Sequence, residues 1–266
     1  MSSSATDTRL RILVPRAADQ AADLIAALSA VGLEGVSVPA IAIETEPGDG
    51  HLDEIARQLD RFRWVLVSSA NGARAVLNAI DRVEATGPAE DGARVSWAAI
   101  GSSTRSILER HGHPVAFEPS TPTAAALAAE LPLAVGERVL VVRGDLAADR
   151  IAAALRRRGA VVDDVIGYRT HEAPEGSREL LARVLAAGPI AGVVLTSGST
   201  ARGLTRLAAA VRLDIARVPV VCIGETTARE AKREGLRVVA VSSRPDPETL
   251  ARTAASALLP PIQETS

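Results

Sequence analysis

The stretch Arg11-Ile-Leu-Val-Pro-Arg16 returns as Arg138-Val-Leu-Val-Val-Arg143, at an offset of 127 residues (138 minus 11). Two further blocks repeat in the same order along the chain. Val65-Leu-Val-Ser-Ser69 matches Val193-Val-Leu-Thr-Ser197, and Ile100-Gly-Ser-Ser-Thr104 matches Ile223-Gly-Glu-Thr-Thr227. Three ordered blocks at nearly constant spacing indicate that the chain is internally duplicated.

Each block has the same local pattern. A short β-branched apolar run, of the kind buried on both faces of a sheet, gives way to polar or small residues and then to an alanine-rich helical pattern. After the first block, the helix is predicted to end at Gly32, which aligns with Gly159 in the second copy. Strands that alternate with helices favour parallel sheets with helices on both faces. We therefore expect an α/β protein, and 266 residues suffice for two domains.

In parallel sheets of this type, ligands bind beyond the carboxyl ends of the strands. The glycine and hydroxyl residues of these turns have a plain structural use in tight turns and helix caps. Their recurrence at equivalent places favours a second use, because backbone N–H groups at helix starts bind carboxylates or phosphates. The candidate binding residues at these ends are Arg16, Ser69, Asn71, Gly101, Thr104, Arg143, Ser197, Gly198, Ser199, Gly224 and Thr227.

Composition excludes several classes of function. The net charge of −2 argues against a globally basic nucleic-acid binder, and five aromatic residues are too few for base stacking. Cys222 is the only cysteine, which excludes a disulfide framework and a thiolate metal site. No apolar run approaches the ~18 residues of a spanning helix. We expect a soluble, cytoplasmic protein that binds neither nucleic acid nor membranes.

Motifs for common cofactors are missing. Gly198 to Thr205 has the glycine spacing of a P-loop, but Leu204 stands where the lysine is needed. No G-x-G-x-x-G follows a predicted strand, and no serine lies in a nucleophile elbow. His111 and His113 are expected to be solvated surface residues. We predict no cofactor and no metal.

Tyr168 is the only tyrosine, in Val165-Ile-Gly-Tyr168-Arg-Thr170. Its segment aligns with the extended stretch around Ile41, where one module can pass into the other. Two interpretations stay open. The ring packs with its hydroxyl in water, or the hydroxyl takes part in chemistry.

These blocks together resemble the uroporphyrinogen-III synthase family. The resemblance rests on the Ser69 and Ser197 turns, on Ile-Gly-x-x-Thr occurring twice, and on Val-Ile-Gly-Tyr-Arg-Thr, and it covers about residues 10 to 259. Pro247-Glu-Thr-Leu250 adds to it. The chain departs from the family at Ala70-Asn71 and at Glu225, and neither departure removes a needed side chain.

The resemblance implies a fold that the repeat alone would misassign. One flavodoxin-like or Rossmann-like domain would combine 1–38 with 172–262, and a second, similar domain would hold 44–165. Segments 39–43 and 166–171 would pair as a two-stranded connector beside an interdomain cleft, and 263–266 would form a flexible tail.

It also implies a reaction. The substrate would be hydroxymethylbilane, a linear tetrapyrrole that a lyase of this family closes with loss of water and inversion of its last ring. This is mainly positioning. By the same resemblance Thr104, Tyr168 and Thr227 would line the site, Ser69, Ser197 and Gly198 would contact the ligand, and Tyr168 would assist departure of the hydroxyl. We expect a monomer and leave open a transient contact with the deaminase that acts upstream.

Two other interpretations compete with this one. A noncatalytic two-lobed sensor predicts tight binding of a small ligand without consumption of hydroxymethylbilane. A sugar-phosphate or nucleotide enzyme on the same architecture is opposed by the failed P-loop and the missing dinucleotide motif.

Overall fold

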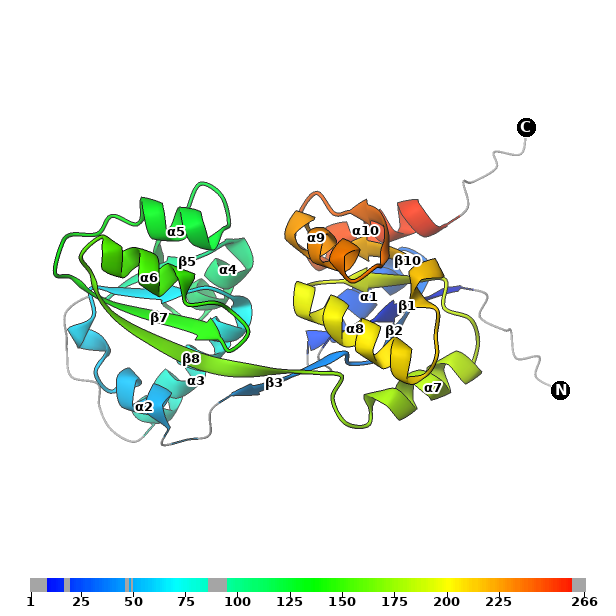
Figure 1. Ribbon diagram of the computed structural model, residues 1–266, viewed down its shortest axis with the longest axis horizontal. Helices are drawn as coiled ribbons and strands as arrows, with labels where there is room; N and C mark the ends of the chain where they lie inside the picture. The colour runs from blue at the N-terminus through cyan, green and yellow to red at the C-terminus, as the bar shows by residue number, and fades with distance from the viewer. Residues whose placement is uncertain (1–8, 17–19, 46–47, 49, 86–94, 260–266) are drawn as a thin grey trace. The chain divides into compact units, whose positions relative to one another are not determined.

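The computed structural model describes residues 9–16, 20–45, 48, 50–85 and 95–259, and Figure 1 shows its helices and strands. The chain divides into two compact units. The first unit contains Met1–Ala42 and His171–Ser266, and the second contains Ile43–Thr170. The predicted flexible tail at 263–266 lies outside the described residues.

Parallel strands form the sheet of the first unit, in the order β11-β10-β9-β1-β2. Its central strands are mostly apolar because helices cover both faces. In β1, Leu13 pairs with Val36 on one side and with Val193 on the other. The strands are β1 (Leu10–Val14), β2 (Leu33–Ser37), β9 (Gly192–Leu195), β10 (Pro219–Cys222) and β11 (Arg237–Val241).

Helices cover this sheet in two layers. Buried leucines of α1 (Ala22–Ala30) and α10 (Pro247–Leu258) pack on one face. On the other face lie α7 (Ser177–Ala186), α8 (Gly198–Ala210) and α9 (Glu225–Arg233). A short 3-10 helix spans Ile215–Arg217. The first unit is thus a doubly wound sheet with an apolar core on each side.

The second unit has the same construction, with the strand order β3-β8-β7-β4-β5-β6. Strands β4 to β8 pair in parallel. The strands are β3 (Ile41–Thr45), β4 (Trp64–Val67), β5 (Ser96–Ala99), β6 (Val115–Phe117), β7 (Arg138–Gly144) and β8 (Val161–Glu172).

Its helices again form two layers, and Figure 1 shows α5 and α6 on one side of the sheet and α2 and α3 on the other. The first core includes α2 (His51–Ala56), α3 (Ala70–Glu84) and α4 (Ser102–Arg110). The second includes α5 (Ala124–Glu130) and α6 (Arg150–Arg157). A 3-10 turn at Leu59–Arg61 precedes β4.

The repeat accounts for the likeness of the two sheets. The first block lies in β1 and β7, the second in β9 and β4, and the third directly after β10 and β5, and these strands occupy the same places in their sheets. Each copy has exchanged its first strand pair, because β1 and β2 lie beside β9 whereas β7 and β8 lie beside β4. The two halves of the repeat are therefore not the two units. The predicted α/β fold with two similar parallel sheets is confirmed.

Repeated glycines end equivalent helices. Gly32 and Gly159 follow α1 and α6 with φ of 80° and 89°, and Gly112 and Gly235 follow α4 and α9 with φ of 83° and 76°. Glycine reaches these angles without steric cost because it has no Cβ. The helix end predicted at Gly32 is confirmed.

Two segments of the first unit pack on α8 at the point where the chain leaves that unit. The Ala173 N–H donates to the Ala40 carbonyl at 2.8 Å. Gly203 of α8 lies against the same carbonyl, since a Cβ on Gly203 would stand 2.0 Å from its oxygen. The nearly buried Glu172 side chain accepts from Arg202 Nε at 2.6 Å. These contacts fix both segments on α8.

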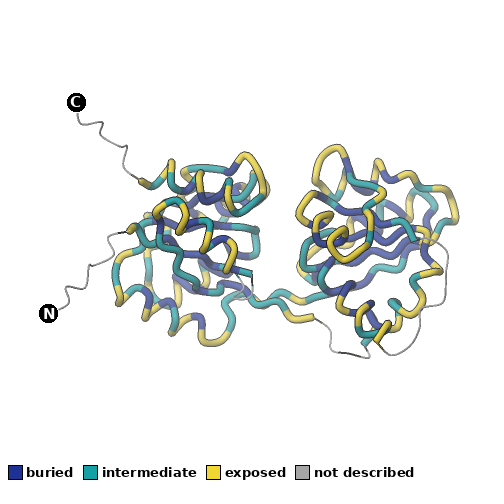
Figure 2. Tube along the Cα trace, turned by 180° about the vertical axis from the view of Figure 1, so that it is seen from behind, coloured by how far each residue is buried: buried dark blue, intermediate teal, exposed yellow. Residues whose placement is uncertain are grey.

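Figure 2 shows the buried colour along the strands of each sheet and the exposed colour along loops and the outer sides of helices. This distribution is the one expected for two separate apolar cores in each unit. In the described part of the chain, no helix combines the length and apolarity needed to cross a membrane.

Candidate functional site

Ser69 begins the turn that follows β4 in the second unit. It is the N-cap of α3, and its Oγ accepts a hydrogen bond from the Gly72 N–H at 3.0 Å. This cap is the plain structural use that the sequence predicts for such a serine. The same Oγ lies 3.0 Å from the hydroxyl of Tyr168. The serine thus joins a helix start to the one tyrosine of the chain.

Tyr168 lies in β8, where it pairs with Gly144 at the end of β7. The ring packs directly against this glycine, because a Cβ on Gly144 would stand 2.6 Å from Tyr168 Cζ and 2.7 Å from its hydroxyl oxygen. Asp145 also holds the strand here, since its N–H donates to the Tyr168 carbonyl at 3.1 Å. Glycine at 144 is therefore what gives the phenol its place beside Ser69.

Burial raises the pKa of the Tyr168 phenol above its ordinary value, and the hydrogen bond with Ser69 opposes that rise. The cause is desolvation, which disfavours the phenolate. A neutral phenol near pH 7 is a hydrogen-bond donor and a weak acid. The site therefore favours hydrogen bonding over complete proton transfer.

The turn after β5 holds two further predicted residues. Gly101 is the N-cap of α4, and Thr104 lies in the first turn of that helix with only 1% of its surface exposed. In the first turn of α3, Asn71 Oδ1 accepts a hydrogen bond from Arg74 Nη1 at 3.4 Å. All three lie at the carboxyl edge of the second unit's sheet, as Ser69 does. Their part in binding stays a prediction.

Arg143, predicted as a substrate ligand, has protein partners for most of its guanidinium. Its Nε and Nη2 donate to the Asp164 carboxylate at 2.9 to 3.1 Å. Its Nη1 donates to the carbonyls of Ala147 at 2.7 Å and Gly144 at 3.3 Å. These bonds hold the loop that follows β7. The geometry indicates a positioning residue more than a free cation.

The turn after β9 in the first unit contains a capping box. Ser197 is the N-cap of α8 and exchanges hydrogen bonds with Thr200, whose N–H lies 3.2 Å from Ser197 Oγ. Ser199 Oγ lies 3.0 Å from the same Ser197 oxygen. A Cβ on Gly198 would stand 3.0 Å from Glu230 Cγ. This turn, like its counterpart at Ser69, is built around a helix start.

The remaining predicted residues also lie in the first unit. Gly224 is the N-cap of α9, and Thr227 lies in its first turn with 6% of its surface exposed. Arg16 follows β1. The structure thus distributes the predicted residues between the carboxyl edges of two sheets. It brings two predicted pairs into contact: Ser69 with Tyr168 from a different strand, and Ser197 with Ser199 within one turn.

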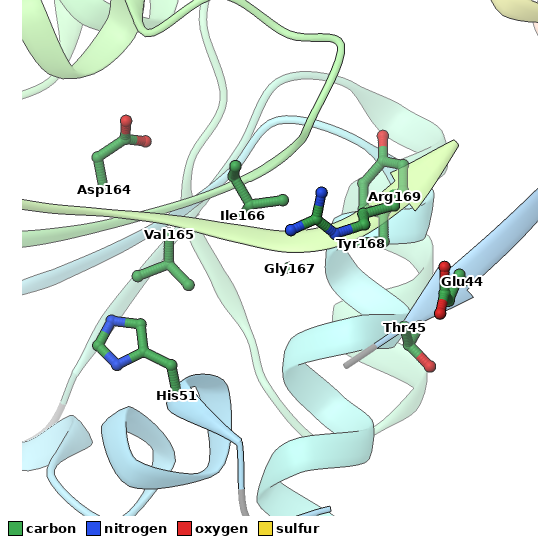
Figure 3. Close-up of a pocket in the computed structure, with 9 residues that line it drawn as sticks. All are labelled: Glu44, Thr45, His51, Asp164, Val165, Ile166, Gly167, Tyr168 and Arg169. Carbon is green, nitrogen blue, oxygen red and sulfur yellow. The ribbon is translucent and has the colours of Figure 1, made fainter. Parts of the chain in front are cut away.

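A hollow of ≈ 450 Å³ runs along β8, and Figure 3 shows residues that line it. Its lining contains the carboxylates of Glu44 and Asp164 together with His51 and Arg169. In Figure 3 the Tyr168 phenol points to the opposite side of β8 from His51. The Asp164 carboxylate is bound by Arg143, so it does not act as a free negative charge in this hollow.

The described residues contain no cluster of three or more His, Cys, Asp or Glu side chains that could hold a metal ion. Cys222 is fully buried in β10, and burial raises the pKa of its thiol to about 12. Such a thiol is not a nucleophile near neutral pH. The polar groups that the structure places at the two sheet edges are hydroxyls, backbone N–H groups and arginines.

Sequence reasoning missed two residues of this arrangement. The pattern marks Gly144 as a turn residue, but its contact with Tyr168 depends on the pairing of β7 with β8. Asp164 has no place in the sequence prediction, and it neutralises Arg143 across the same two strands. The acidic pair Asp163-Asp164 within the otherwise apolar stretch Val161–Ile166 was the signal that could have found it.

Comparison with known proteins gives consistent results. Residues 22–252 match the family model described as uroporphyrinogen-III synthase HemD. The porphyrin biosynthesis protein HemD of Ruminiclostridium josui is 29% identical over 232 residues, which cover 86% of this chain and 45% of that protein. The chain therefore spans less than half of that relative's length. The chloroplastic uroporphyrinogen-III synthase of Oryza sativa subsp. japonica is 28% identical over 88% of this chain and 76% of that protein.

A solved structure supports the fold. A crystal structure of mutant uroporphyrinogen III synthase from the extremely thermophilic bacterium Thermus thermophilus aligns with a TM-score of 0.64 and 19% identity. The alignment covers 94% of this chain and 98% of that one. At this sequence identity the structural similarity supports the fold alone.

Proposed function

This chain belongs to the uroporphyrinogen-III synthase family, and we propose that it is a lyase that converts hydroxymethylbilane into uroporphyrinogen III. In that reaction a linear tetrapyrrole with eight carboxylates loses water and closes with its last ring inverted. The family match across residues 22–252 carries the proposal, because it spans strands of both sheets. The family does not support the alternative of a noncatalytic sensor.

The turns support a positioning mechanism. Four strands, β4, β5, β9 and β10, run into helix N-termini at the carboxyl edge of their sheets. Backbone N–H groups at such ends and the helix dipole attract carboxylates. Binding through many such donors restrains a flexible chain and lowers the entropy cost of ring closure. We assign Ser69, Gly101, Ser197, Gly198 and Gly224 to this function.

Tyr168 is the group that we assign to the leaving hydroxyl. Gly72 already donates to Ser69 Oγ, so the serine proton is available for the Tyr168 oxygen. The phenolic proton is then free to hydrogen-bond the substrate hydroxyl while the C–O bond breaks, and the hydroxyl leaves as water with the proton that the substrate's own pyrrole N–H gives up. The raised pKa of Tyr168 makes this a hydrogen-bonding step.

Isomer analysis tests the proposal. The protein is incubated with freshly made hydroxymethylbilane, the products are oxidised, and the type I and type III isomers are separated. Spontaneous closure gives type I, so an excess of type III that scales with protein concentration is the expected result. Type I alone would overturn the proposal. A cytoplasmic location, a monomer and a transient contact with the upstream deaminase stay predictions.

A further inference from the structure

The strand order of the second unit changes direction between β7 and β4. From β7 the chain continues to β8 on one side, whereas from β4 it continues to β5 on the other. Ligands of open α/β sheets bind outside the carboxyl ends of the strands at such a point. A cavity of ≈ 300 Å³ lies there, lined by Ser68 after β4, Ile100 after β5 and Arg143 in β7.

Most of the residues that line this cavity are apolar, and several of them are small. Besides Ile100, they are formed by Ala124, Ala147, Ala148 and Ile151. Apolar walls with a few polar groups are typical of sites for small organic ligands, and the volume lies at the lower end of their range. Such a cavity suits the face of one heteroaromatic ring better than a whole tetrapyrrole.

The loop between β7 and α6 is held in place by Arg143. Its Nη1 donates to the Ala147 carbonyl at 2.7 Å, and its Nε and Nη2 donate to the Asp164 carboxylate. The charge of Arg143 is therefore compensated inside the protein. Its contribution to the cavity is a fixed wall.

Arg150 supplies the remaining cation. It lines the cavity as the first residue of α6, and its side chain is exposed. Within the described part of the chain, no hydrogen bond or ion pair engages its guanidinium. Asp149 precedes it but does not line this cavity. An uncompensated guanidinium beside apolar walls fits a ring that carries a carboxylate, because the planar fork binds carboxylates bidentately.

We propose that this cavity binds one pyrrole ring of the substrate and that Arg150 binds a carboxylate on that ring. Arg143 acts indirectly, by holding the wall at Ala147. The inference rests on the proposed function for the identity of the ligand.

The first test compares Arg150→Gln with Arg157→Gln. Arg157 is also exposed and lies two turns along the same helix, about 10 Å away, without lining the cavity. We expect Arg150→Gln to raise KM for hydroxymethylbilane by about threefold to tenfold with kcat within about twofold, and Arg157→Gln to change neither. An unchanged KM in Arg150→Gln, or equal rises in both variants, would overturn the inference.

A binding measurement separates this inference from the proposed function. Uroporphyrin III, the stable oxidised octacarboxylate, is titrated with each variant by fluorescence, and Kd should rise by the same factor in Arg150→Gln alone. If the wild-type protein forms no type III isomer while Arg150→Gln still shows this rise in Kd, the proposed function is refuted and the binding site is kept. Normal type III formation with equal Kd values would refute the site alone.

A second pair of variants tests the apolar walls. Ala148→Leu should fill the exposed side of the cavity and lower kcat/KM by about threefold or more. Ala125→Leu, on an exposed position of α5 outside the cavity, should leave kcat/KM unchanged. Equal kcat/KM values in the two variants would contradict the proposed ring site.

Discussion

Replacing Tyr168 with Phe removes one hydroxyl and keeps the ring against Gly144. The lost interaction is the 3.0 Å contact with Ser69 Oγ, together with the proposed hydrogen bond to the substrate. A neutral hydrogen bond contributes about 0.5–1.5 kcal/mol, which corresponds to about twofold to tenfold in rate. General acid catalysis contributes about 10²-fold or more. We therefore expect kcat for type III formation to fall about threefold to tenfold.

The assay is the initial rate of type III formation at saturating hydroxymethylbilane. A loss of more than about 100-fold would refute the hydrogen-bonding account and indicate full proton transfer. No change in kcat would remove Tyr168 from the reaction altogether. Ser69→Ala is the matched variant, because it removes the partner and keeps the phenol. Its kcat should also fall, and its free energy of unfolding should fall by about 1–2 kcal/mol since the α3 cap is lost as well.

The buried Tyr168 also predicts that the free energy of unfolding falls as pH rises into the alkaline range. Burial raises its pKa in the folded protein, so the unfolded chain ionises first as pH rises. This contribution is complete below about pH 10, the unfolded value, and is lost as pH rises from there through the higher folded pKa. Denaturant unfolding between about pH 9 and 11 should show a steeper decline for the wild type than for Tyr168→Phe. Parallel declines would contradict the buried position of the phenol.

Three further predictions concern stability and reactivity. Gly203→Ala should lower the free energy of unfolding by about 1–3 kcal/mol despite the better helix propensity of alanine, because its Cβ meets the Ala40 carbonyl; denaturant melts with an unchanged midpoint would refute that packing. Glu172→Gln should lower the free energy of unfolding by about 1–3 kcal/mol, because Arg202 loses a nearly buried anionic partner. Glu172→Asp is not expected to restore the wild-type free energy of unfolding. Cys222 should resist a thiol reagent near neutral pH until the protein unfolds, and rapid labelling of the native protein would contradict its burial.

The internal repeat was sufficient to predict that the chain forms two similar parallel sheets. The blocks at Arg11 and Arg138 mark equivalent strands, and the glycines at 32 and 159 end equivalent helices. The exchange of β1 and β2 for β7 and β8 could not follow from the repeat. Two similar copies give the same sequence similarity whether each first strand pairs within its own copy or with the other. The family resemblance supplied that choice.

The contacts within the site could not be predicted from the sequence, because they too depend on which strands are neighbours. Ser69 and Tyr168 are 99 positions apart, and their hydrogen bond depends on how β7 lies between β8 and β4. The same adjacency joins Arg143 to Asp164 and removes most of its free charge. Sequence patterns predicted that Ser69 and Arg143 lie at the carboxyl ends of parallel strands. They could not predict which of them satisfy one another.

The isomer ratio tests the central claim most directly. Hydroxymethylbilane is divided between a protein-free sample and samples with increasing protein, and the oxidised products are separated after equal times. We predict type I alone without protein and a type III fraction that approaches completion as protein increases. A type III fraction that stays at the protein-free level, with folded protein at every concentration, would contradict the account.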